Sequence, residues 1–149
     1  MTAISCVRLL GFDAGHRVYG HEGKCAHLHG HRYKVELHAR GESGLDALGR
    51  VVDFSVLKER VGGWIDANWD HGLILYGGDP MAEVLSGTSI PGGAGATQKL
   101  YVLGENPTAE NLAKHLLERI IPPLMLGSGC DVIRVVLWET PNCFAVAEF

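Results

Sequence analysis

No hydrophobic run in this 149-residue sequence approaches the length of a membrane-spanning helix, and the N-terminus lacks the basic region, apolar core and cleavage site of a secretion signal. These absences predict a cytoplasmic protein. Cysteines are also few: Cys6, Cys25, Cys130 and Cys143 show no paired spacing. In a reducing compartment we expect them to be free thiols, which argues against a disulfide-stapled domain.

Charge of one sign does not dominate any stretch of the chain. The 17 acidic and 13 basic residues are spread along the sequence and give a net charge of -4. A basic stripe for nucleic acid is therefore absent, and any phosphate would have to be bound by a local group of residues. The 46% hydrophobic content suits one globular domain, residues 1–149, with an apolar core.

Groups that bind metals or transfer protons are concentrated in one stretch, Cys25–His31, which contains three of the eight histidines. The stretch leads into residues 31–40, which alternate in character and therefore predict a strand. His29 and His31 would point to the same side of that strand, close enough to bind one metal ion. His16, at the end of the first alternating stretch, is the best placed third ligand.

Three imidazoles with a vacant fourth position are typical of a catalytic zinc ion, because the open position binds water or substrate. Two other arrangements fit the same spacing. The thiol of Cys25 could be a fourth ligand that closes the site, and His27 could reach the metal from a loop. A chance cluster on a polar strand, with no metal, is the simplest alternative.

The remaining periodicities predict an α+β fold. They indicate strands at residues 4–12, 31–40, 50–52, 132–139 and 143–149, and helices at 54–67 and 106–121. We expect Asp53 and Asn106 to cap the two helices, with Pro107 in the first turn of the second helix and Pro122 ending it. Apart from the short strand at residues 50–52, the order is ββααββ, which predicts a four-stranded antiparallel sheet with both helices on one face.

Residues 76–104 are rich in glycine and fit no continuous element. They contain Gly77-Gly78-Asp79-Pro80 and Pro91-Gly92-Gly93, with a helical turn predicted only at residues 81–85. A long loop of this kind in a small domain is usually functional or disordered. We interpret it as an insertion that is either a mobile lid or a loop at an oligomer edge, with a plain surface insertion as the alternative.

Further residues could take part in chemistry. Asp70 could orient the adjacent His71, which exchanges protons near neutral pH, or the two could form an ordinary turn. Glu139 ends an apolar strand, where its carboxylate would either face solvent or accept a pair of N–H donors. Cys25 is the candidate proton acceptor, because a nearby metal or imidazolium lowers the pKa of a thiol.

Several short motifs occur in an order that resembles a known family. They are Phe12-Asp13-Ala14-Gly15-His16-Arg17, Lys24-Cys25, His29-Gly30-His31, Tyr33, Val52-Asp53-Phe54, Asp70-His71, Asn106-Pro107-Thr108, Glu110-Asn111 and Glu139-Thr140. Together they resemble the 6-pyruvoyl-tetrahydropterin synthase superfamily and, within it, the bacterial 6-carboxytetrahydropterin synthases of the queuosine pathway. The resemblance implies the tunnelling fold (T-fold), whose sheets join edge to edge into a barrel, and a homohexamer built from two trimers.

The resemblance also implies a zinc-dependent lyase that acts on the pterin 7,8-dihydroneopterin triphosphate. The implied Zn2+ ligands are His16, His29 and His31, and the implied catalytic residues are Cys25, Asp70, His71 and Glu139. In this scheme Cys25 removes a carbon-bound proton and His71 shuttles protons. Glu139 both binds the pterin ring and takes part in a charge relay.

The product depends on which branch of the family the chain resembles. The carboxy enzymes also cleave a carbon–carbon bond and release acetaldehyde, whereas the pyruvoyl enzymes stop after eliminating triphosphate. The spacing Cys25-x-x-x-His29 resembles the carboxy branch. Two alternatives from other classes are a non-catalytic zinc or pterin-binding module, which would not need Cys25, and a zinc hydrolase, which would need a base such as Glu139 near the metal.

Overall fold

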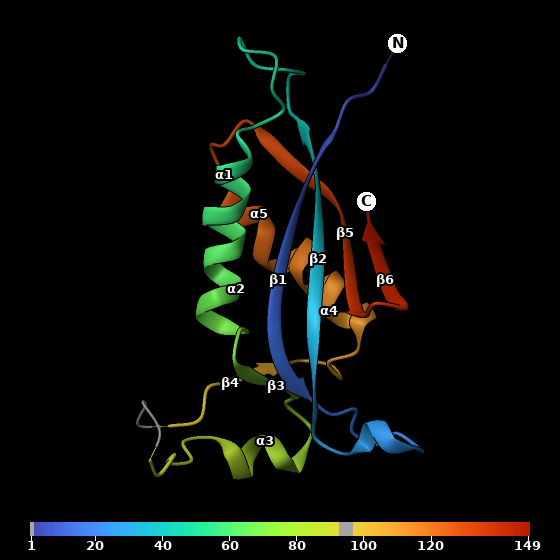
Figure 1. Cartoon of the computed structure of the whole chain (residues 1–149), viewed down its shortest axis with the longest axis vertical. Helices are drawn as coiled ribbons and strands as arrows, with labels where there is room; N and C mark the ends of the chain where they lie inside the picture. The colour runs from blue at the N-terminus through green and yellow to red at the C-terminus, as the bar shows by residue number, and fades with distance from the viewer. Residues whose placement is uncertain (1, 93–96) are drawn as a thin grey trace.

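The computed structural model describes residues 2–92 and 97–149, and its strands form one curved six-stranded sheet (Figure 1). The strands are β1 (Cys6–His16), β2 (His29–Gly41), β3 (Gly72–Tyr76), β4 (Leu100–Leu103), β5 (Cys130–Thr140) and β6 (Cys143–Glu148). Their spatial order is β4-β3-β1-β2-β5-β6. The predicted α+β class is confirmed, but the predicted number of four strands is wrong.

The two strands that the sequence did not reveal are β3 and β4. Strands β1, β2, β5 and β6 pair antiparallel as expected, whereas β3 pairs in parallel with residues Ala14–His16 of β1, and β4 pairs in parallel with β3. The β3 sequence is the apolar run Leu73-Ile74-Leu75, which has no alternation and therefore carries no period-two signal. Only its pairing with β1 and β4 identifies it as a strand.

The first helical stretch runs without a break beside β1. It consists of α1 (Phe54–Leu57), a π-helical segment (Lys58–Gly62) and α2 (Gly63–Asn68). Asp53 caps it as predicted, because its side chain accepts a hydrogen bond from the Ser55 amide. Gly62 allows the close approach to the sheet, since a Cβ at this position would lie only 3.4 Å from Leu10 Cδ2.

The second helical stretch corrects three details of the prediction. It consists of α4 (Ala109–His115), a π-helical segment (Leu116–Ile120) and α5 (Ile121–Met125). Thr108, rather than Asn106, is the capping residue, so Pro107 precedes the cap and is not in the first turn. The helix also continues through Pro122 and Pro123. The prolines are tolerated because they lie in the first turn of α5, where their missing N–H groups are not needed.

Both helical stretches cover the same face of the sheet, and the core lies between them and that face. Side chains from every layer are no more than 1% exposed there, including Val35, Leu37, Leu57, Ile65, Leu112 and Leu116. The buried positions of β1 and β2 alternate with exposed ones, as period-two patterning requires. Within the described ranges, no helix has the length and apolar character needed to cross a membrane.

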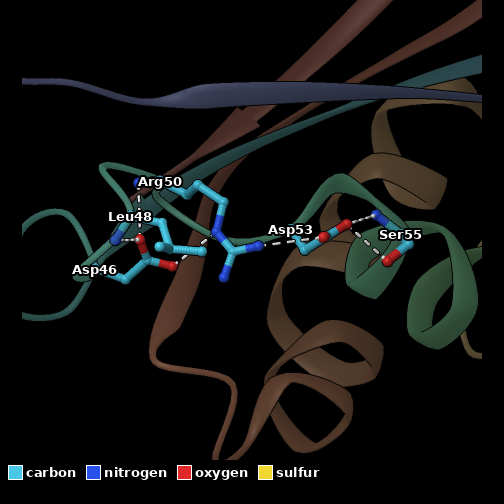
Figure 2. Close-up of polar contacts among 5 residues, drawn as sticks. All are labelled: Asp46, Leu48, Arg50, Asp53 and Ser55. Carbon is cyan, nitrogen blue, oxygen red and sulfur yellow. Dashed lines mark hydrogen bonds and ion pairs between the residues drawn. The ribbon is translucent and has the colours of Figure 1, made fainter.

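The connection from β2 to α1 is a loop, not the strand predicted at residues 50–52 (Figure 2). Asp46 Oδ1 accepts the amide N–H groups of Leu48 and Arg50 at 2.9 Å each. The Arg50 guanidinium joins Asp46 Oδ2 at 2.9 Å to Asp53 Oδ2 at 3.3 Å. These local bonds satisfy backbone groups that a strand would have paired with a neighbour.

The glycine-rich stretch contains more structure than the sequence predicts. A helix, α3 (Pro80–Leu85), is found at the predicted helical turn, and β4 forms close to the end of the stretch. Residues 93–96 of the predicted insertion lie outside the described part of the chain. The lid and oligomer-edge interpretations stay predictions.

Helix α3 is joined to the end of β1 by a part-buried ion pair, in which Asp79 is buried and the Arg17 side chain is 21% exposed. Arg17 Nε donates to Asp79 Oδ2 at 2.7 Å and Arg17 Nη2 donates to Asp79 Oδ1 at 2.5 Å. Asp79 is 2% exposed and also caps α3 by accepting the Met81 amide. The hydrogen bond from Arg17 lowers the pKa of Asp79 below its usual value. Sequence reasoning missed this pair because 62 residues separate its members.

We expect Asp79→Asn to lower the free energy of unfolding at pH 7 by about 3 kcal/mol, because the amide can still cap α3 but leaves Arg17 without its counter-charge. Since the pKa of Asp79 is lowered in the folded state, the pair stabilises above the unfolded pKa, and this contribution is lost as the pH falls through the folded value. The difference in the free energy of unfolding between variant and wild type should therefore become smaller below about pH 4.

Urea unfolding followed by circular dichroism at several pH values measures this difference. The matched control is Asp46→Asn in the exposed pair with Arg50, which should change the unfolding midpoint much less. An equal effect of the two substitutions at pH 7 would contradict the structural role of the Arg17–Asp79 pair.

Candidate functional site

Three histidines meet where β1 ends and β2 begins. The antiparallel register places His16 opposite His29, and Ala14 opposite His31. All three rings lie on the helix-covered face of the sheet, and one ligand nitrogen of each lies within 4.8 Å of the other two. The sequence-predicted trio is therefore brought together, in an arrangement that could hold a metal ion.

Backbone carbonyls orient two of the three rings. The Nδ1 of His16 hydrogen-bonds to the Pro107 carbonyl at 2.7 Å, and the Nδ1 of His29 to the His27 carbonyl at 2.7 Å. A carbonyl can only accept, so each Nδ1 carries the proton and each Nε2 presents a lone pair. The two Nε2 atoms lie 3.1 Å apart, which places both lone pairs at a common centre.

The third ring shows the strongest sign of a missing partner. His31 Nε2 is buried and has no hydrogen-bond partner within the described part of the chain. A buried polar atom of this kind is costly unless something binds it. Burial lowers the pKa of His31, and it lowers that of His16 to about 4. Both rings are therefore neutral near pH 7, the form that binds metal, so this donor set fits a divalent cation.

Glu139 lies beside the same cluster. Its Oε1 is 3.3 Å from His16 Nε2 and 3.5 Å from His31 Nε2, and its side chain is 28% exposed. Strand β5 places it there because Val135, Leu137 and Glu139 alternate onto the face that the histidines share. The carboxylate can thus act on a molecule at the cluster while it remains open to solvent.

Cys25 lies in a short 3-10 turn (Lys24–Ala26) next to the cluster in sequence. Its carbonyl accepts the Val18 amide at 2.8 Å, which holds the turn against the end of β1. The thiol is half-buried and is not among the three clustered ligands of the described chain. The arrangement therefore differs from the alternative in which sulfur closes the metal site. His27 supplies its carbonyl to His29, not a ring to the cluster.

Asp70 and His71 form a hydrogen-bonded pair in the turn between α2 and β3. His71 Nδ1 lies 2.8 Å from Asp70 Oδ2, and the His71 side chain is 77% exposed. Adjacent side chains would diverge on a strand, but His71 adopts a positive φ of 59°, which brings the two together. Asp70 Oδ1 is occupied by the Asp13 amide at 2.9 Å, so the carboxylate is held in one orientation.

Within one chain, Asp70 and His71 form a group with Asp13 that is separate from the group of three histidines. The side chain of Asp13, which clusters with Asp70 and His71, alternates with the inward-facing Ala14 and His16. The cluster of Asp13, Asp70 and His71 could in principle hold a metal ion. However, both oxygens of Asp70 already have hydrogen-bond partners, which favours an oriented imidazole over a cation site.

Sequence reasoning missed the residues that hold the first histidine. Asn106 exchanges two hydrogen bonds with the Tyr19 backbone, at 2.8 and 3.0 Å, and its carbonyl accepts Asn111 Nδ2 at 2.9 Å. This network fixes the position of the Pro107 carbonyl against His16. The motif that predicted a helix start therefore also serves the histidine cluster, through contacts that its own spacing does not reveal.

Comparison with known proteins assigns the family. The sequence profile described as 6-pyruvoyl tetrahydropterin synthase matches residues 5–148. The chain belongs to the 6-pyruvoyl tetrahydropterin synthase family. Within this family, a protein of Rickettsia bellii named 6-carboxy-5,6,7,8-tetrahydropterin synthase is 48% identical over 141 residues, which cover 95% of this chain and 97% of the relative. A protein of the same name from Aquifex aeolicus is 35% identical and covers 87% and 88% of the two chains.

Solved structures support the same family fold. An uncharacterized protein from Wolinella succinogenes superposes with a TM-score of 0.81 at 25% identity and covers 99% of both chains. The 6-pyruvoyl tetrahydropterin synthase of Caenorhabditis elegans gives a TM-score of 0.68 at 23% identity, over 100% of this chain and 97% of that one. The T-fold implied by the sequence motifs is therefore the fold of this family member, with β3 and β4 added to the antiparallel strands.

For this family member we expect His31→Ala to weaken the binding of Zn2+, used as a probe, by about 100-fold or more. Loss of a residue that binds the metal directly lowers metal affinity more than loss of a residue that only orients a ligand. The matched control is His27→Ala, which removes a ring but keeps the carbonyl that orients His29. Competition with a fluorescent chelator measures both affinities. An unchanged affinity in His31→Ala, or an equal loss in His27→Ala, would contradict the proposed ligand set.

Proposed function

We propose that this protein is a 6-carboxy-5,6,7,8-tetrahydropterin synthase. It would convert 7,8-dihydroneopterin triphosphate and water to 6-carboxy-5,6,7,8-tetrahydropterin, acetaldehyde and triphosphate, a step in queuosine biosynthesis in the cytoplasm. The observation that carries the proposal is the 45–48% identity to four Rickettsia proteins of this name, each matched over 95% of this chain and 97% of the relative. The cluster of three imidazoles supplies the metal ligands that such a reaction requires.

In this proposal His16, His29 and His31 hold a zinc ion through their Nε2 atoms. When bound, zinc supplies Lewis-acid chemistry that makes a carbon-bound proton beside a coordinated oxygen more acidic. The ligands are pre-oriented, because the Pro107 and His27 carbonyls hold the rings of His16 and His29. Little reorganisation is then needed when substrate arrives.

Glu139 would receive the pterin ring. A carboxylate can accept the ring N–H and the exocyclic amine together, and Glu139 reaches the cluster while 28% of its side chain stays open. Its position within 3.5 Å of His31 Nε2 also fits the relay role, because a carboxylate there can stabilise a proton on a neighbouring group. Glu36 cannot take this role, because its oxygens bind Trp138 Nε1 and His38 Nε2.

Cys25 would remove the carbon-bound proton, with His71 exchanging protons and Asp70 holding its ring. The turn at Lys24–Ala26 lies just before the start of β2, where His29 and His31 are found, which supports this role for the thiol. His71, however, is grouped with Asp13 and Asp70, not with the three histidines of its own chain. The proposal therefore requires that His71 serve the site of a second copy, which fits the homohexamer of two trimers that the family resemblance implies.

One alternative draws support from a specific observation. Glu139 lies close enough to the imidazoles to act as a base for metal-bound water, as a zinc hydrolase would need. A hydrolase would not require Cys25 or His71. The family's other reaction, elimination of triphosphate alone, would require Cys25 but would release no acetaldehyde.

Product identification by mass spectrometry tests the proposal. Zinc-loaded wild-type protein should convert 7,8-dihydroneopterin triphosphate to the carboxy pterin, and Cys25→Ala should lower kcat by about 100-fold or more while zinc content stays unchanged. Cys143→Ala, which removes an exposed cysteine at the start of β6, is the control and should keep full activity.

Other results would support a different reaction, mechanism or function. A pyruvoyl pterin as the final product would assign the other branch of the family. Full turnover by Cys25→Ala would remove the thiol from the mechanism, and no turnover by the wild type would favour a binding module.

A further inference from the structure

The peptide group between Asp70 and His71 is held at both of its polar atoms. The Asp70 carbonyl accepts a hydrogen bond from the Lys99 ammonium at 2.5 Å, and the His71 amide donates to the Asp13 carbonyl at 2.7 Å. Rotation of this peptide would break both bonds. The orientation of the group is thus determined by two residues that are distant in the sequence.

This orientation matters because the conformation of His71 is an unfavourable one. A φ of 59° places a residue with a Cβ in the left-handed region, which is sterically disfavoured. His71 is the one non-glycine residue with positive φ in the described ranges. Relaxation to an ordinary φ would turn the ring away from Asp70, and the hydrogen bond between Nδ1 and Oδ2 would be lost.

Lys99 reaches the turn along a defined path. Its backbone carbonyl accepts the Leu73 amide at 3.0 Å, just before β4, and its stem lies over Gly72, where a Cβ would meet Lys99 Cγ at 3.0 Å. Its ammonium also donates to the Asp66 carbonyl at 2.7 Å, near the C-terminus of α2. A cation is favourable at this end of a helix, so the ammonium joins α2 to the turn.

The positive charge of Lys99, like its hydrogen bonds, favours the hydrogen bond between Asp70 and His71. Burial raises the pKa of Asp70, but the Asp13 amide, His71 and Lys99 together lower it below its usual value. Asp70 therefore stays an acceptor for the proton on His71 Nδ1. Both effects of the ammonium keep the His71 ring in one orientation and in one tautomer.

We propose that Lys99 is a positioning residue for His71. It holds the Asp70–His71 peptide so that the ring keeps its proton on Nδ1, toward Asp70, and leaves Nε2 free for proton exchange. The inference rests on the proposed catalytic role of His71. This inference also gives a role to the last part of the glycine-rich stretch, because that part places Lys99 next to the turn.

The first test is spectroscopic and needs no substrate. Protein labelled with 15N at histidine reports the tautomer of each ring at pH 8, and His71→Gln assigns the His71 signals. We expect the Nδ1–H tautomer in the wild type, in Lys99→Arg and in the control Lys58→Met, which changes an exposed lysine on the π-helical segment. Lys99→Met should shift the His71 population toward the Nε2–H tautomer.

Lys99→Met keeps the apolar stem over Gly72, so we expect it to fold. If it does not, Lys99→Gln, which removes the charge and shortens the reach, takes its place. An unchanged His71 tautomer in the folded variant would overturn the proposal, and so would an equal change in Lys58→Met.

The second test uses the proposed reaction. Lys99→Met should lower kcat by about tenfold or more with KM and zinc content unchanged, because only the orientation of His71 is lost. Lys99→Arg should restore most of the activity, and adding Lys99→Met to His71→Ala should cause no further loss. Additive losses would overturn the positioning role, whereas a wild type without turnover would overturn the proposed function and leave the tautomer as the test of Lys99.

Discussion

The antiparallel register of β1 and β2 is the constraint on which the candidate site depends. Pairing His16 with His29 puts three ring nitrogens at one point on the core side of the sheet. A shift of one residue would send His29 and His31 to the other face, because strand side chains alternate with a period of two. The apolar residues that follow on β2 resist such a shift, since Val35 and Leu37 would leave the core. Packing of the core and geometry of the site therefore stabilise the same register.

Backbone carbonyls also orient the histidine rings that this register brings together. Imidazoles on a strand can rotate, but the carbonyls of Pro107 and His27 each bind one Nδ1 and leave Nε2 facing the cluster. The first carbonyl comes from a segment 91 residues away, held by Asn106 and the start of α4. The second half of the chain thus sets the tautomer of a ligand in the first half. The same logic recurs at Asp70 and His71, where Asp13 and Lys99 hold a backbone group and so orient a ring.

Local patterns predicted much of the fold because they report on burial. The alternation on β1, β2, β5 and β6 and the helical period of the two helical stretches follow from having one face in the core. The patterns failed at β3, whose apolar run has no alternation, and at Pro122, where a π-helical turn allows the helix to continue. They also failed at residues 50–52, because Asp46 supplies local hydrogen-bond partners that replace a neighbouring strand. At β3 a distant contact decided the structure, whereas at Pro122 and at residues 50–52 local backbone geometry and local hydrogen bonds decided it.

The sequence by itself determined the α+β class, the family and the candidate ligands, because the spacing of His29 and His31 and the period of the strands place side chains on a common face. Only the tertiary structure decided that Glu139 joins those rings, that Asp79 holds Arg17, and that His71 lies with Asp13 and not with the three rings. The reason is physical. Alternation specifies the face of one strand, whereas the approach of segments that are far apart in the sequence, such as those of His16 and Glu139, depends on how the whole core packs.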